Sequence, residues 1–145
     1  MTAAIEPAKG IAGLKGTLRY VRAYRDRVFV VKLGGEVLDD ADVLDGVAAQ
    51  LALLASLGIR IVVVHGGGKL VDRRLEALGI RSERRDGIRI TPPEHLTEVV
   101  ATLAGIVNTM VVGGLQRCGV GAVGLTLGDG LTANASTADA FAFDP

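Results

Sequence analysis

The sequence has few of the residues that carry disulfide, redox or metal chemistry. Its 145 residues include a single cysteine, Cys118, so no disulfide can form within the chain. A lone cysteine is typical of proteins in a reducing cytosol. No cysteine and histidine residues share the spacing of a metal site. We therefore expect a cytoplasmic protein without a metal centre built from its own side chains.

An excess of charge of one sign is also absent. The 16 basic residues balance the 16 acidic residues, so the chain has no overall attraction to nucleic acid or to a membrane surface. No apolar run reaches the roughly 18 residues of a membrane-spanning helix. The N-terminus lacks the charged and apolar regions of a signal peptide. The sequence thus predicts no nucleic-acid partner and no membrane partner.

Aromatic residues are scarce as well, at 3% of the chain, so the hydrophobic 49% is mainly aliphatic. Blocks of valine, leucine, isoleucine and alanine favour buried parallel strands covered by helices, which is an α/β fold.

The length of the chain suits one domain. We expect residues 1–16 to be flexible and residues 17–145 to form the folded lobe. A short helix should begin near Thr17, and its arginines are compatible with an anion-binding patch and with a solvated helix face.

The most informative stretch is an apolar run that ends in a lysine and two glycines. Residues 28–31 are all apolar and mostly β-branched, which predicts a buried strand. Lys32 follows, and Gly34 and Gly35 allow the backbone to turn sharply and to approach an anion closely. By itself, this stretch is compatible with a phosphate site and with an ordinary core strand followed by a turn.

A second apolar run also ends in glycine. Residues 61–64 predict another buried strand, and His65 and three glycines follow it. Between the two runs, apolar residues at helical spacing predict a helix that begins after Asp39 or Asp40 and ends at Gly58. This order is a βαβ unit, so the two strands should be parallel.

Both glycine turns should therefore lie at the same edge of the sheet. Ligands of such sheets bind outside the carboxyl ends of the strands, where helix N-termini offer free N–H groups and partial positive charge. Because the second turn, Gly66, Gly67 and Gly68, is equivalent to the first, the pair favours an anionic ligand. His65 is compatible with a structural and with a catalytic role, and we expect Lys69 to be solvated.

Residues 84–90 predict a β-hairpin, because an Asp-Gly pair at the centre is typical of a tight type I′ turn. Arg89 would lie on the opposite side of the hairpin from its two isoleucine neighbours. If the hairpin folds over the glycine turns, Arg89 reaches their rim, where a guanidinium can bind a substrate carboxylate through a bidentate fork. A solvated arginine is the alternative, which we expect for Arg84 and Arg85.

A long apolar helix is predicted after the hairpin. Residues 91–94 have the pattern of a capping box with proline at the first helical position, and the helix should run towards Cys118. Asn108 is compatible with a ligand contact and with a helix-packing hydrogen bond. The glycine pair at 113–114 is compatible with close helix packing and with a break in the helix.

The glycines of residues 119–124 match G-x-G-x-x-G, but they are not a dinucleotide fingerprint. That motif follows a strand and opens a helix, whereas these glycines follow a helix and overlap the next predicted strand, residues 122–126. A turn at residues 127–130 and a further strand at residues 131–135 complete the predicted elements.

Four stretches in register resemble the acetylglutamate kinases of the amino-acid kinase family. The resemblance covers roughly residues 17–140 and rests on these stretches: Lys32-Leu33-Gly34-Gly35, His65-Gly66-Gly67-Gly68, Gly87-Ile88-Arg89-Ile90-Thr91 and Gly124-Leu125-Thr126-Leu127-Gly128-Asp129-Gly130. It implies a three-layer αβα sandwich with a mainly parallel sheet. Because family members are about twice as long, this chain would be the N-terminal lobe only.

The resemblance also implies a reaction, the ATP-dependent phosphorylation of the side-chain carboxylate of N-acetyl-L-glutamate in arginine biosynthesis. ATP with Mg²⁺ would bind in a C-terminal nucleotide lobe that is absent from this chain. We therefore expect the isolated chain to be the substrate-binding half and to be inactive. The resemblance further implies a homodimer or a higher oligomer, for which the stripe from Leu96 to Val107 is a candidate interface.

Residue by residue, the resemblance assigns roles to both glycine turns and to the hairpin. Lys32 would neutralise the transferring phosphoryl group. Three glycines would approach that group through the backbone: Gly34, Gly35 and Gly66. Gly67 and Gly68 would hold the acetylglutamate, and Arg89 would bind its α-carboxylate.

A kinase-like, arginine-binding regulatory domain of an acetylglutamate synthase is the alternative. Such a domain binds arginine and assembles subunits without transferring phosphate, so it has no need of a lysine at the phosphoryl position. Lys32 and the intact glycines of residues 66–68 favour the kinase.

Overall fold

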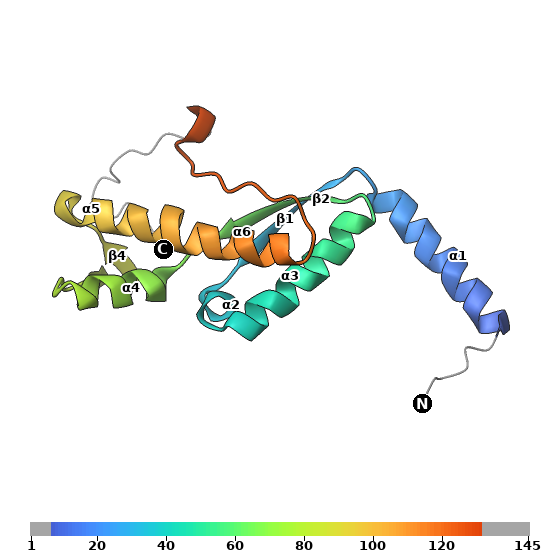
Figure 1. Cartoon of the computed structure of the whole chain (residues 1–145), viewed down its shortest axis with the longest axis horizontal. Helices are drawn as coiled ribbons and strands as arrows, with labels where there is room; N and C mark the ends of the chain where they lie inside the picture. Colours follow the sequence, from blue (N-terminus) through green and yellow to red (C-terminus); the bar gives the residue numbers. More distant parts are fainter. Residues whose placement is uncertain (1–6, 132–145) are drawn as a thin grey trace.

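The computed structural model describes residues 7–131 (Figure 1). The helices and strands, in chain order, are α1 (Pro7–Tyr24), β1 (Val28–Leu33), α2 (Gly35–Asp39), α3 (Ala41–Ser56), β2 (Arg60–His65), α4 (Gly68–Ala77), β3 (Glu83–Arg85), β4 (Ile88–Ile90), α5 (Pro93–Val100), η1 (Ala101–Val107), α6 (Asn108–Arg117) and η2 (Asp129–Leu131). The described chain thus alternates strands and helices, as an α/β fold does.

β1 and β2 form the predicted parallel pair. The register joins Val28 to Arg60 at one end of the pair and Leu33 to His65 at the other. α3 connects the two strands, which makes the predicted βαβ unit. The short helix α2, between β1 and α3, is an element that the sequence did not predict.

α3 begins and ends where the sequence signals place it. The carboxylate of Asp40 accepts hydrogen bonds from the backbone N–H groups of Asp42 and Val43, at 2.9 and 3.2 Å. This N-cap satisfies two N–H groups that have no partner inside the helix. After α3, Gly58 adopts a φ of +82°, a conformation that glycine reaches without a steric penalty.

Helices cover one face of the β1–β2 pair. Val31, Ile61 and Val63 pack from this face against a buried cluster that joins the sheet to α2, α3, η1 and α6. The cluster consists of Leu33, Leu38, Leu44, Ala48, Leu51, Val107, Val111 and Leu115. The parallel sheet and the α/β class are therefore confirmed.

The opposite face of the pair is open within the described residues. Val30, Val62 and Val64 are 68%, 48% and 48% exposed. The prediction that both apolar runs are buried is therefore correct for one face only. The runs are apolar on both faces, and periodicity alone does not distinguish a strand covered on two faces from one covered on one face.

α1 is longer than the sequence predicted and stands apart from the other elements. It begins at Pro7 rather than near Thr17, so it includes residues that were expected to be flexible. Figure 1 shows that α1 extends away from the sheet and from the other helices. At its C-terminal end, the ring of Tyr24 meets that of Phe29 edge-on, with centroids 5.5 Å apart.

β3 and β4 form the predicted antiparallel hairpin. Asp86 and Gly87 have φ angles of +50° and +80°, as a type I′ turn requires. In this register Arg84 lies directly opposite Arg89.

One continuous helix, Pro93–Arg117, follows the hairpin and comprises α5, η1 and α6. A proline occupies the first helical position, but it is Pro93 rather than Pro92, because the N-cap is Pro92 rather than Thr91, and no side chain caps the N-terminus. The predicted capping box is therefore wrong. The glycine pair is not a break, because both residues lie inside α6. Close packing is the alternative that the structure supports, since a Cβ at Gly114 would lie 3.8 Å from the Cβ of Ala48 in α3.

By length and composition alone, this helix could cross a membrane, since it has 25 residues and contains an 18-residue window with a mean hydropathy of 1.6. Its sequence contains no unbroken apolar run of that length, because glycine, threonine and asparagine interrupt the apolar residues. One such helix is weak evidence of a membrane protein, since a helix in the core of a soluble protein has the same character. Val107, Val111 and Leu115 pack one face of this helix into the core, and 28% of its 18-residue apolar window is buried.

The segment after α6 lacks the predicted strand. Residues 122–126 pair with no other strand in the part of the chain that the structure describes. Val123 and Leu125 are 83% and 69% exposed. A turn follows at residues 127–130, as predicted, and leads into η2. The further strand predicted at residues 131–135 lies outside the described residues, apart from Leu131.

Gly67 provides a test of how the long helix packs on the sheet. A Cβ at Gly67 would lie 2.9 Å from Leu103 Cδ2 and 2.9 Å from Val107 Cγ2, and the φ of Gly67 is +156°. We expect Gly67→Ala to lower the free energy of unfolding by about 1–3 kcal/mol, through strain and overpacking. Gly66→Ala is the matched control, because a Cβ there meets nothing within 4 Å. Equal denaturant midpoints for the two variants would contradict this packing.

Candidate functional site

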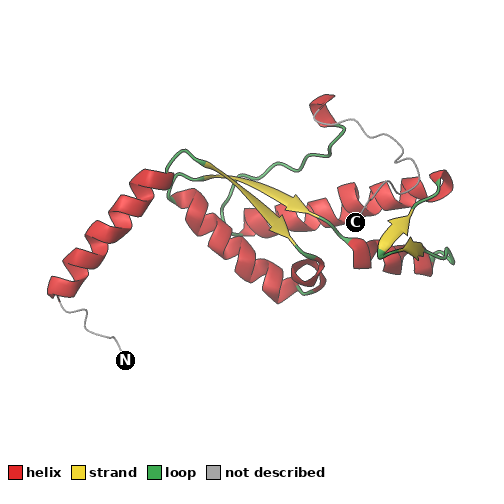
Figure 2. Cartoon of the chain, turned by 180° about the vertical axis from the view of Figure 1, so that it is seen from behind, coloured by secondary structure: helices red, strands yellow, loops and turns green. Residues whose placement is uncertain are grey.

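The carboxyl ends of β1 and β2 lie at the same edge of the sheet and lead into helices. Gly34 precedes α2, and Gly67 is the N-cap of α4. Figure 2 shows that both strand arrows point towards the end of the sheet where these helices begin. The first N–H groups of a helix lack a carbonyl partner inside the helix and carry partial positive charge. This edge therefore suits an anion, as the sequence predicts.

Four of the five predicted site glycines have open space beside them. A Cβ at any of these four would meet no neighbouring atom within 4 Å: Gly34, Gly35, Gly66 and Gly68. Gly67 differs, because it is buried against Leu103 and Val107. Packing within the chain thus explains why position 67 is a glycine, whereas the other four glycines leave the backbone accessible.

Arg89 lies at the second glycine turn, as predicted. Its Nη2 donates hydrogen bonds to the carbonyl oxygen of Gly68 at 2.7 Å and to Asp72 Oδ1 at 2.5 Å, and its Nε donates to Ser82 Oγ at 3.0 Å. These contacts use the single hydrogen of Nε and both hydrogens of Nη2. Nη1 has no acceptor among the described residues, so it is the part of the guanidinium that remains for a ligand.

Asp72 in α4 also binds the second arginine of the hairpin. Arg84 Nη2 donates to Asp72 Oδ2 at 2.6 Å, so Arg84 is exposed, as predicted, but also forms an ion pair that the sequence did not indicate. Desolvation alone would raise the pKa of Asp72. The hydrogen bonds from Arg84 and Arg89, the charge of Arg89 and a contribution from Ser82 together hold that pKa below its usual value of 3.8. Asp72 is therefore ionised at neutral pH.

Lys32 lies at the end of β1 on the open face of the sheet. It pairs in register with Val64, and its side chain is exposed. Among the described residues, no carboxylate forms an ion pair with Lys32. The structure therefore joins Arg89 to Gly68 directly, while Lys32 shares their edge of the sheet without a described contact to either.

A second carboxylate, Asp39, connects the two helices that follow the glycine turns. Asp39 Oδ2 lies 2.9 Å from Lys69 Nζ, and Asp39 Oδ1 lies 2.5 Å from Arg73 Nη2. Asp39 is at the end of α2, and both cations are in α4. Lys69 is solvated, as predicted, with 64% of its side chain exposed, and its ion pair with Asp39 also links the two sides of the candidate site.

Sequence reasoning missed three polar residues around the site: Asp39, Asp72 and Ser82. One signal for Asp72 was present, because two arginines directly opposite each other in a hairpin repel unless a counter-ion lies between them. The sequence did not indicate which acidic residue provides that charge.

His65 and Asn108, whose roles the sequence does not decide, both contact nearby residues of the chain. His65 Nδ1 lies 3.0 Å from the carbonyl oxygen of its neighbour Gly66, which fits a donor at Nδ1 and agrees with the structural alternative. The side-chain amide of Asn108 lies against Gly124, where a Cβ would come within 2.3 Å of Asn108 Nδ2. Asn108 therefore packs α6 against the segment that follows it.

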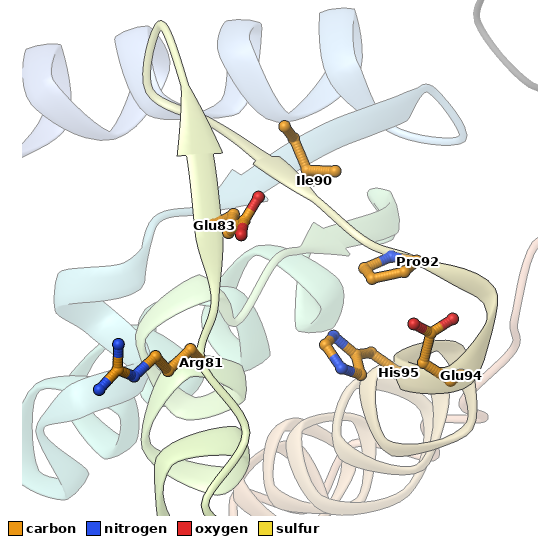
Figure 3. A pocket seen from close by; sticks show the side chains of 6 residues that line it. All are labelled: Arg81, Glu83, Ile90, Pro92, Glu94 and His95. Carbon is orange, nitrogen blue, oxygen red and sulfur yellow. The ribbon is translucent and has the colours of Figure 1, made fainter.

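A hollow of about 230 Å³ lies between the hairpin and the start of α5 (Figure 3). Its lining residues are Arg81, Glu83, Ile90, Pro92, Glu94 and His95. Neither Arg89 nor a glycine of the turns lines it. Its charges are of mixed sign, and no group of three metal-ligating side chains occurs among the described residues. We therefore place the candidate site at the glycine turns.

Curated relatives with a similar sequence are acetylglutamate kinases. Those from Synechococcus sp. (strain CC9311) and Campylobacter hominis are 44% and 36% identical to this chain. Both matches cover 83% of this chain, but only 42% and 43% of the relatives. The chain thus spans less than half the length of these relatives.

Solved structures are similar to this chain in fold. The N-acetylglutamate synthase of Neisseria gonorrhoeae, complexed with coenzyme A and N-acetyl-glutamate, has a TM-score of 0.62 and 29% identity over 78% of this chain and 26% of its own. The smu.665 protein of Streptococcus mutans has a TM-score of 0.58 and 26% identity over 66% of this chain and 38% of its own.

The sequence profile of the amino acid kinase family matches residues 27–142. This range contains both glycine turns, the hairpin with Arg89 and the long helix. Because the match covers most of the sequence, the chain belongs to the amino acid kinase family.

Proposed function

We propose that this chain is the acetylglutamate-binding half of an acetylglutamate kinase, an enzyme of arginine biosynthesis. The observation that carries the proposal is the position of Arg89, whose guanidinium is held 2.7 Å from the Gly68 carbonyl at the N-terminus of α4. An oriented guanidinium beside a helix N-terminus suits a carboxylate. The two kinase relatives support this substrate and this reaction.

In the proposed reaction, the γ-phosphoryl group of ATP passes to an oxygen of the side-chain carboxylate of N-acetyl-L-glutamate, which yields an acyl phosphate and ADP. Such a transfer depends on positioning and charge neutralisation rather than on covalent chemistry by the protein. Lys32 is suited to neutralise the transferring group, because its side chain is exposed at the strand end and lacks an acidic partner among the described residues.

The glycines position the reacting groups through their backbone. Open space beside three of them supports a close approach to the phosphoryl group: Gly34, Gly35 and Gly66. Gly67 and Gly68 would hold the acetylglutamate at the start of α4. In this arrangement Arg89 binds the α-carboxylate through Nη1 rather than through the predicted fork, because Nε and Nη2 are already occupied.

The described residues do not fit a Mg²⁺ site of their own, since no group of three carboxylate, histidine or cysteine side chains could hold a metal. We therefore derive no step through Mg²⁺. We assign ATP binding to the part of the longer relatives that this chain does not match.

Two further expectations stay predictions. One is a homodimer or higher oligomer that assembles through the exposed residues Leu96, Val100 and Ile106. The other is a cytoplasmic location.

A regulatory domain of an acetylglutamate synthase is the second candidate. Its support is the likeness to the N. gonorrhoeae synthase, at a TM-score of 0.62. Lys32 argues against it, because a domain that transfers no phosphate needs no lysine at that position.

The carboxylate assignment of Arg89 is tested by titration calorimetry with N-acetyl-L-glutamate. Arg89→Ala removes a charge-assisted hydrogen bond worth roughly 1.5–3 kcal/mol, so we expect affinity to fall by about ten- to a hundredfold. Arg81→Ala is the matched control, since it removes the same charge from a residue outside the glycine turns. Affinity that persists unchanged in Arg89→Ala would refute the assignment.

We also expect the 145-residue chain to catalyse no phosphoryl transfer by itself, because it matches only about two-fifths of the kinase relatives. The measurement is a coupled assay of ADP release with and without N-acetyl-L-glutamate, in which added ADP verifies the coupling enzymes. ADP release that depends on acetylglutamate would contradict this expectation and would place nucleotide binding within the chain.

A further inference from the structure

We propose that Asp72 is a positioning residue that orients Arg89 for the α-carboxylate of the substrate. This inference rests on the proposed function, and it assigns a role to a carboxylate that does not itself touch the substrate.

The hairpin places two like charges face to face. Arg84 in β3 is the register partner of Arg89 in β4. Side chains of directly opposite residues lie on the same face of a hairpin, and like charges there destabilise the pair. A hairpin of two short strands is in any case marginally stable in water. The observed position of Arg89 therefore needs an external counter-ion.

Asp72 provides this counter-ion from α4. Its Oδ2 accepts from Arg84 Nη2 at 2.6 Å, and its Oδ1 accepts from Arg89 Nη2 at 2.5 Å. One carboxylate thus bridges both strands and docks the hairpin on the helix whose N-terminus forms the second glycine turn. The Arg89 side chain is only 14% exposed in this position.

The bridge also determines which atoms of Arg89 remain for a ligand. Asp72 and the Gly68 carbonyl together use both hydrogens of Nη2, and Ser82 uses that of Nε. The two hydrogens of Nη1 have no acceptor among the described residues. Because the guanidinium is planar and held at two of its three nitrogens, the direction of Nη1 is determined.

The local charge still favours an anion. Asp72 carries one negative charge, while Arg84 and Arg89 carry one positive charge each, so the three side chains have a net charge of one positive unit. Asp72 therefore removes the repulsion between the arginines without cancelling the attraction for a carboxylate. A role confined to stabilising the fold would affect all ligands equally, whereas a role in orienting Arg89 affects only ligands that have the α-carboxylate.

Two variants of the full chain separate these roles. Asp72→Asn keeps the shape of the side chain and removes its charge. Glu76→Gln is the matched control, because it removes the same charge one turn later in α4, from an exposed residue whose side chain forms no hydrogen bond or ion pair with the described residues. Each variant is titrated with N-acetyl-L-glutamate and with 4-acetamidobutanoate, which lacks only the α-carboxylate. Amide hydrogen exchange of the ligand-free proteins is the second readout.

We expect Asp72→Asn to weaken acetylglutamate binding about tenfold or more and to leave 4-acetamidobutanoate binding unchanged, so that the preference for acetylglutamate is lost. Exchange should become faster at residues 83–90 and stay the same in β1. Glu76→Gln should behave as the native chain in both experiments.

Retained preference for acetylglutamate in Asp72→Asn, or an equal loss for both compounds, would overturn the inference. Unchanged exchange at residues 83–90 would overturn it as well. If the native chain binds neither compound, the proposed function fails, and the exchange data alone then decide whether Asp72 holds the hairpin.

Discussion

Parallel pairing of β1 with β2 brings two glycine turns to one edge of the sheet. Because the register ends with Leu33 opposite His65, both chains leave the sheet side by side and both enter helices. A shift of one residue would exchange the two faces of a strand and would remove Leu33 from the core. The core on the covered face therefore determines the geometry of the candidate site.

Ion pairs then connect the elements around this edge. Asp39 links α2 to α4, and Asp72 links α4 to the hairpin. Exposed ion pairs individually add little stability, but these carboxylates each contact two cations and so determine orientation. The result is a positively charged rim at the N-terminus of α4, with Arg89 Nη1 available. This combination supports a carboxylate ligand more strongly than the glycines alone.

Much of this fold could be predicted from sequence, because its signals are local. The Asp40 cap, the Gly58 conformation and the Asp-Gly turn of the hairpin each depend on a few adjacent residues. What the sequence missed depends on contacts between distant segments. Asp72 is a polar residue on an amphipathic helix, and no periodicity indicates that it meets two arginines. The open face of the sheet and the unpaired residues 122–126 were missed because strand signals do not reveal whether a covering layer or a partner strand is present.

A crystal structure of the chain with N-acetyl-L-glutamate would show directly which atoms of Arg89 bind the ligand. We expect the α-carboxylate to lie about 3 Å from Arg89 Nη1 while Nη2 keeps its contacts with Asp72 and Gly68. A ligand bound elsewhere, or an Arg89 that leaves Asp72 to bind the carboxylate through Nε and Nη2, would contradict it.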